Sequence, residues 1–164
     1  GRPAVALSRL IPLLDRPGLQ EYEVNLLLPR MAYAHLELGH LEQAAAAAAQ
    51  STQRARAQHH HVALVDALRV RGMAMTRLQR WEEAHRTLEE ALSLARRMGY
   101  PWAEGQILHE YGVMHARKGN PERARELLEE ALAIFRRLGA RPYIERTEHA
   151  LRSDDESKRQ LTGI

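Results

Sequence analysis

The sequence contains no cysteine, which excludes disulfide bonds and metal sites built from thiolates. This absence is compatible with a reducing compartment, and we expect a cytoplasmic protein. No apolar run approaches the roughly 18 residues that a membrane helix needs, so we expect no membrane partner. No signal-peptide pattern opens the chain. The first residues are Gly1-Arg2-Pro3, without a methionine, and this start suggests a fragment of a longer protein.

Aromatic residues make up only 5% of the 164 residues, and alanine supplies much of the 45% apolar share. Aromatic and β-branched side chains favour strands, whereas alanine is the strongest helix former. The composition therefore predicts an all-α fold with closely packed helices. Lysine is scarce as well, since Lys118 and Lys158 are the only two. The net charge of +3 is spread along the chain without a long basic run, so nucleic acid is not indicated as a partner.

Recognisable catalytic patterns are also missing. The sequence has no glycine-rich phosphate loop, no HExxH pattern and no cysteine nucleophile. The three adjacent histidines at 59–61 fall at a turn between helices, whereas helical metal ligands are spaced by four residues. We therefore predict a non-enzymatic protein with no cofactor and no bound metal.

What the sequence does contain is a repeat. The segment Leu88–Gly99 reads LEEALSLARRMG, and forty positions later Leu128–Gly139 reads LEEALAIFRRLG, with eight of twelve positions identical. Upstream of each copy lies a second stretch with helical apolar periodicity, so the unit is two amphipathic helices joined by a short turn. One helix pair cannot bury its apolar face, whereas stacked copies bury each other's faces.

Capping residues mark where the helices end. Asn120 followed by Pro121 is typical of a helix start, because asparagine caps free N–H groups and proline loses nothing at the first helical position. Gly99 and Gly139 follow arginines and fit the left-handed residue that closes a helix. Pro29 lies about eight residues into an expected helix and predicts a kink, unless that helix begins nearer Leu28.

The repeat resembles the tetratricopeptide-repeat (TPR) family, which places small residues at three points per repeat where helices approach closely. The residues that carry the resemblance are Ala32, Gly72 and Gly112 at the first point, Ala44, Ala84 and Ala124 at the second, and Ser51, Ala91 and Ala131 at the third. Larger positions of the family match Leu28, Leu68 and Leu108, and also Leu88 and Leu128. The resemblance implies a right-handed superhelical solenoid of stacked antiparallel helix pairs.

The repeats depart from the family in length, since they span forty residues and lack the usual proline near the end. This longer form resembles the repeats of bacterial signal-transduction ATPases of the maltose-regulator type, which carry transcription-regulator modules. We expect one TPR-like domain over residues 1–164. Its parts are the second helix of a truncated repeat (1–18), three repeats (19–58, 59–98 and 99–138), a capping helix (139–152) and a polar, frayed tail (153–164).

The resemblance also implies a binding site, because the first helix of each TPR repeat lines a concave groove. The positions carried over from the family are Arg30, Tyr33, Glu37, Asp66, Arg69, Met73, Arg77, His109, Glu110, Val113 and Arg117. By helical spacing Arg69, Arg77 and Arg117 form a basic stripe, which suits the carboxylates of an acidic partner unless it is simply solvated. The carboxylate clamp of chaperone-binding members is absent, because Arg69, Met73 and His109 occupy its positions.

These features predict a non-catalytic scaffold for protein–protein interaction. Its partner would be a protein, a peptide or another domain of the same chain. The alternative is an effector-sensing or oligomerisation domain of a signal-transduction ATPase or transcription regulator. Self-association through the apolar N-terminal edge is a further hypothesis.

Overall fold

The computed structural model describes residues 2–14 and 20–162, and all regular structure within these ranges is helical. The helices are α1 (Arg2–Leu14), α2 (Glu21–Glu37), α3 (Leu41–Ala57), α4 (His61–Arg77), α5 (Trp81–Arg97), α6 (Pro101–Lys118), α7 (Pro121–Leu138) and α8 (Arg141–Thr162). The predicted all-α class is confirmed. None of the helices in these ranges has the length and apolarity needed to cross a membrane.

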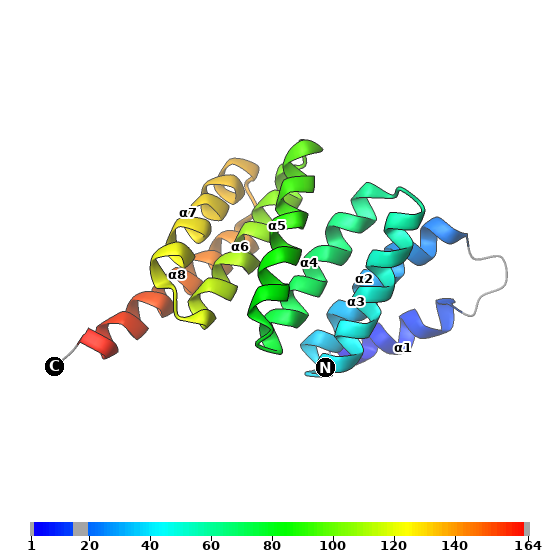
Figure 1. The fold of residues 1–164 in the computed structure, drawn as a ribbon, viewed down its shortest axis with the longest axis horizontal. Helices are drawn as coiled ribbons and strands as arrows, with labels where there is room; N and C mark the ends of the chain where they lie inside the picture. Colours follow the sequence, from blue (N-terminus) through cyan, green and yellow to red (C-terminus); the bar gives the residue numbers. More distant parts are fainter. Residues whose placement is uncertain (1, 15–19, 163–164) are drawn as a thin grey trace. The chain divides into compact units, whose positions relative to one another are not determined.

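The chain divides into two compact units, Gly1–Ala91 and Leu92–Ile164, with the boundary inside α5. In the first unit α2 packs against α1, α3 and α4, and α3 also packs against α4. In the second unit α6 packs against α7, and α8 packs against both of them. Figure 1 follows these helices in chain order. Each unit therefore combines packing between consecutive antiparallel helices with packing between helices two apart in the chain, which are α2 with α4 and α6 with α8.

A fixed turn sets the spacing of the helices. From α2 to α8 the helices begin at residues 21, 41, 61, 81, 101, 121 and 141, which are twenty residues apart. Each connecting turn holds one residue with positive φ, again at twenty-residue spacing: Gly39, His59, Gln79, Gly99, Gly119 and Gly139. The left-handed conformation predicted for Gly99 and Gly139 is confirmed.

The hydrogen bonds of the first of these turns are those of a Schellman motif. The Gly39 amide donates to the Leu36 carbonyl at 3.1 Å, and the His40 amide donates to the His35 carbonyl at 2.9 Å. The His40 carbonyl then accepts from the Ala44 amide at 2.9 Å, which opens α3. The residue that closes one helix thus caps the next, and the same bonds recur in the other turns.

Side-chain caps agree with the predicted boundaries. The Asn120 side chain accepts from the Arg123 amide at 3.3 Å, as expected for the cap before Pro121. His59 and His60 lie in a turn as predicted, whereas His61 is the first residue of α4. His59 takes the left-handed conformation, and His60 Nδ1 accepts from the Ala63 amide at 3.2 Å. That bond gives His60 a capping role at the start of α4.

Two expectations about helix ends differ from the structure. Pro29 lies inside α2, which begins at Glu21, so the alternative start near Leu28 is wrong. Helix α8 continues to Thr162 instead of ending near residue 152, because neither glycine nor proline interrupts the sequence after Pro142 until Gly163. The ends of the expected N-terminal segment and tail, residues 1, 15–18 and 163–164, lie outside the described residues.

The nine small positions of the repeat are all buried. A Cβ atom added to Gly72 would lie 2.5 Å from Leu88 Cγ, and one added to Gly112 would lie 2.6 Å from Leu128 Cγ. In the first pair, Ala32 and Ala48 occupy the equivalent positions and share a buried cluster with Val70. A glycine therefore faces a leucine in the second and third pairs, whereas two alanines fill the space in the first.

We predict that Gln79→Gly stabilises the first unit by about 1 kcal/mol, because a left-handed conformation is costly for residues with a Cβ. The measurement is the free energy of unfolding in urea. Gln79→Ala is the matched control, since it shortens the exposed side chain but keeps the strain. Equal stabilities for the two variants would contradict the prediction.

We also predict that Gly72→Ala destabilises the protein by about 1–3 kcal/mol, because its methyl group overlaps Leu88. In a Leu88→Ala background the same change should be neutral or stabilising, since that pair reproduces the alanines of the first repeat and alanine is the better helix former. A double-mutant cycle of unfolding free energies measures the coupling. Additive effects would show that the two residues do not pack as described.

Candidate interaction surface

Seven of the predicted groove residues lie in the first unit, on α2 and α4, which pack side by side. Arg30, Tyr33 and Glu37 belong to α2, spaced by three and four residues along one side of the helix. Asp66, Arg69, Met73 and Arg77 follow the same spacing on α4. The equivalent residues of the second unit are on α6 and are described separately below.

An ion pair joins the two helices at one end of this surface. Arg77 Nη2 lies 2.9 Å from Glu37 Oε1, and the same guanidinium donates to the backbone carbonyl of Leu36. That carbonyl belongs to the last turn of α2, where the helix dipole favours a cation. The Arg77 and Glu37 side chains keep 30% and 35% of their area exposed, so the pair remains accessible from solvent.

Arg69 is more enclosed than Arg77. Its Nη2 lies 2.7 Å from Asp66 Oδ1 on the preceding turn, and its Nη1 lies 3.5 Å from the Met73 sulfur. Only 13% of the Arg69 side chain is exposed, and Met73 is 4% exposed. Met73, one of the predicted groove residues, is therefore buried inside the first unit.

The α2 residues differ in exposure. Arg30 is exposed and donates to the backbone carbonyl of Leu26 on its own helix. Tyr33 is half-buried, and its ring packs against the cluster of Ala32, Ala48 and Val70. The tyrosine thus combines a fixed ring with a partly accessible edge, a combination that is frequent in protein interfaces.

In the second unit, the predicted residues on α6 contact α8. His109 is 2% exposed, with Nδ1 lying 3.0 Å from Thr147 Oγ1. Glu110 is 7% exposed, and its carboxylate lies 2.9 Å from Arg146 Nη2. Val113 is half-buried and Arg117 is exposed. His109 and Glu110 therefore serve packing between α6 and α8, and of the four predicted residues on α6 only Val113 and Arg117 reach solvent.

Burial decides the charge state of His109. Desolvation lowers its pKa, the Arg146 guanidinium lowers it further, and the Glu110 carboxylate opposes both. His35 on α2 also has a lowered pKa, first from burial and then from the charge of His40. Both effects favour neutral imidazole rings in the folded protein.

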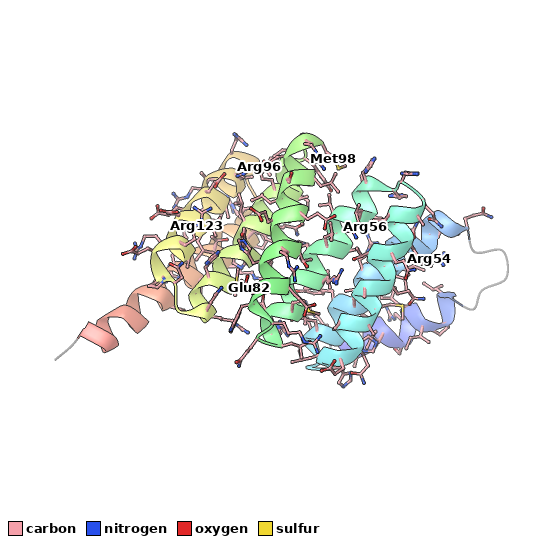
Figure 2. The ribbon with its side chains drawn as sticks, viewed as in Figure 1. Arg54, Arg56, Glu82, Arg96, Met98 and Arg123 are labelled. Atoms are coloured by element: carbon pink, nitrogen blue, oxygen red, sulfur yellow. The ribbon has the colours of Figure 1, made fainter. Side chains whose placement is uncertain are left out.

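The predicted basic stripe is partly neutralised. Arg69 and Arg77 both contact carboxylates of the first unit, at distances where charges pair directly. Glu37 and Arg77 are forty residues apart, which is one full repeat. The repeat register is therefore the sequence signal that could have predicted this pair. Two other missed pairs recur in register on the second helix of each repeat: Arg56–Glu90 and Arg96–Glu130, each at 2.5 Å. In Figure 2, Arg56 and Arg96 lie near the C-terminal ends of α3 and α5.

Other kinds of site are not indicated by geometry. Among the described residues, no group of three or more His, Asp or Glu side chains could hold a metal ion. The side chains that do gather on α2 and α4 are guanidinium, carboxylate and phenol groups. Such groups bind peptide carboxylates, amides and aromatic side chains.

Comparison with known proteins gives a fold and no family. No family model matches the sequence, and no curated protein matches it. Among solved structures, the chain is similar to the crystal structure of BtubC (BKLC) from P. vanneervenii, with a TM-score of 0.65 and 15% sequence identity. The match covers 98% of this chain and 73% of that chain. At this identity the similarity concerns the fold alone.

We predict that the second unit loses stability below pH about 6.5, the value at which an ordinary histidine takes up a proton. The folded-state pKa of His109 is lowered, so the unfolded chain binds a proton there while the folded chain does not. Stability therefore falls as pH drops below about 6.5. Unfolding free energies measured across this range test the expectation.

His109→Asn should flatten this pH dependence, because asparagine can still bond Thr147 but does not titrate. His149→Asn replaces an exposed histidine of α8 and is the matched control. If the two variants and the wild type show the same slope, His109 is not the titrating group.

Proposed function

We propose that the chain is a TPR-type repeat scaffold that binds a peptide or partner domain on the α2–α4 surface, without catalysis. Three observations support the repeat assignment. Helices start every twenty residues, small residues are buried at all nine register points, and the glycine–leucine contact recurs forty residues apart. Helices that repeat in this way stack into solenoids whose first helices form one continuous face.

The observation that carries the binding proposal is the Arg77–Glu37 pair. It holds α2 beside α4, so that residues at the same position in successive repeats become neighbours. Tyr33, Glu37 and Arg77 then form one partly exposed surface around a half-buried aromatic ring. A partner carboxylate can exchange with Glu37 or Asp66 for the arginine forks, which are already oriented.

This replacement of Glu37 or Asp66 by a partner carboxylate determines the chemistry of the partner. Arg69 and Arg77 each already pair with a protein carboxylate, so a partner that brings a single negative charge gains little affinity. An acidic segment that also carries an apolar side chain gains more affinity, because it can pair with both Arg69 and Arg77 and contact Tyr33. The forty-residue repeats also suit a fragment of a larger bacterial regulatory protein, in which the partner is another domain of the same chain.

The test is selection of binders from a random displayed peptide library, with the chain as bait. We predict that the selected peptides are rich in Asp and Glu. Arg69→Glu combined with Arg77→Glu should weaken their binding at least about tenfold, because both guanidiniums become repulsive.

Arg56→Glu with Arg86→Glu is the matched control, since it makes the same charge change on α3 and α5 and also removes one ion pair. This control should keep the wild-type affinity, and thermal unfolding checks that both variants are folded. Equal losses in the two double variants would place the binding surface elsewhere.

A further inference from the structure

The first helix pair differs from the others at three positions inside the pair and at a fourth position at its edge. The first pair has polar residues at these positions, namely Asn25, Ser51, Arg54 and Gln58. The equivalent residues of the second pair are Val65, Ala91, Leu94 and Met98. Those of the third pair are Gly105, Ala131, Ile134 and Leu138. Apolar residues at such positions pack neighbouring helices together. Their replacement by four polar residues in one pair sacrifices packing, so a physical reason is required.

Asn25 and Ser51 are buried, Arg54 and Gln58 are half-buried, and the hydrogen bonding of the group is incomplete. Asn25 is 1% exposed and Ser51 is 0% exposed. Within the described part of the chain, three buried atoms of this group have no hydrogen-bond partner: Asn25 Oδ1, Ser51 Oγ and Arg54 Nε. Each buried polar atom left unbonded has lost its hydrogen bonds to water without replacement, which destabilises the folded state.

The register and one direct contact place the four side chains together. Asn25 Nδ2 donates to Gln58 Oε1, which joins α2 to α3. In the third pair, a Cβ on Gly105 would lie 3.2 Å from Ile134 Cγ2, and these are the positions of Asn25 and Arg54. Ser51, Arg54 and Gln58 follow one another at helical spacing on α3. Figure 2 shows Arg54 and Arg56 on opposite sides of α3. Arg56 Nη2 lies 2.5 Å from Glu90 Oε1 on α5.

Among the side chains that the structure describes, no carboxylate balances the positive charge of Arg54. Arg54 makes no ion pair within the described residues, and α1 contains no acidic residue. Glu23 is engaged by the Gln20 amide at 2.8 Å at the start of α2. Glu42 lies in the first turn of α3, about three helical turns from Arg54. A guanidinium that is partly buried without a carboxylate favours an anion from solution.

We propose that Asn25, Ser51, Arg54 and Gln58 form a binding site for a small oxyanion that also carries an O–H group. The anionic oxygens accept hydrogen bonds from Arg54 Nε and the Ser51 hydroxyl. The O–H group of the ligand donates to Asn25 Oδ1. A 2-hydroxycarboxylate and hydrogen phosphate both have this chemistry, whereas sulfate at neutral pH has the charge without the donor.

Binding at this site would act on the first pair. A ligand that binds only the folded state stabilises it, and the three unbonded atoms gain their partners at the same time. The site is separate from the α2–α4 surface proposed for a protein partner, and either proposal can fail without the other.

Thermal unfolding of the chain in lactate, phosphate, sulfate and chloride, at matched ionic strength and neutral pH, tests the site. We expect lactate or phosphate at about 20 mM to raise the Tm by about 3–5 °C above chloride, with sulfate giving less than half of that rise. A response to lactate alone identifies a carboxylate ligand, and a response to phosphate alone identifies a phosphoryl ligand. Equal Tm values in all four salts would overturn the proposal and leave water as the occupant.

Two variants locate the response. Ser51→Ala removes one hydroxyl with little change in volume and should weaken titrated binding at least tenfold. Asn25→Val, Ser51→Ala, Arg54→Leu and Gln58→Met together copy the second pair, and should raise the Tm in chloride while abolishing the anion response. Arg56→Leu, on the same helix but in an exposed ion pair, is the matched control and should respond like the wild type. An anion response that survives in the Ser51→Ala variant and in the fourfold variant would overturn the assignment.

Discussion

The short turn with one left-handed residue is the constraint on which the rest of the structure depends. The residue that closes one helix also caps the next, and every helix from α3 to α8 begins twenty residues after the previous one. Two such steps bring the chain back to the same kind of helix. Residues forty apart therefore occupy equivalent environments, which is why Gly72 and Gly112 face Leu88 and Leu128 in the same way.

Equivalent environments still permit compensation between partners. In the second and third pairs, a leucine on the second helix packs against a glycine on the first helix. In the first pair, Ala48 on the second helix and Ala32 on the first helix belong to one buried cluster. The volume at the crossing is shared between two side chains, so neither position is constrained alone. Exposed ion pairs such as Arg56–Glu90 recur in the same register, but their exposure limits their contribution to stability.

Helix boundaries and buried small positions could be predicted from the sequence because they depend on local turn chemistry and on periodicity. Gly139 and the Asn120 cap are examples. The ion pairing and the exposure of the surface residues could not be predicted, because both depend on which side chains of another helix contact them. Arg77 meets Glu37 across one repeat, and His109 is buried by Thr147 of α8. Periodicity gives the face of a helix, whereas exposure depends on what packs against that face.

At the polar residues of the first pair, the repeat register predicts apolar side chains and the sequence has polar ones. A register that accepts Val65 and Leu94 in the next pair would accept apolar residues at Asn25 and Arg54. Packing therefore cannot account for the polar side chains, and local helix propensity does not require them. Interior positions that break a rule obeyed by their equivalents are where function is expected to override stability. In a repeat protein the other repeats supply the comparison, so one chain identifies the exception by itself.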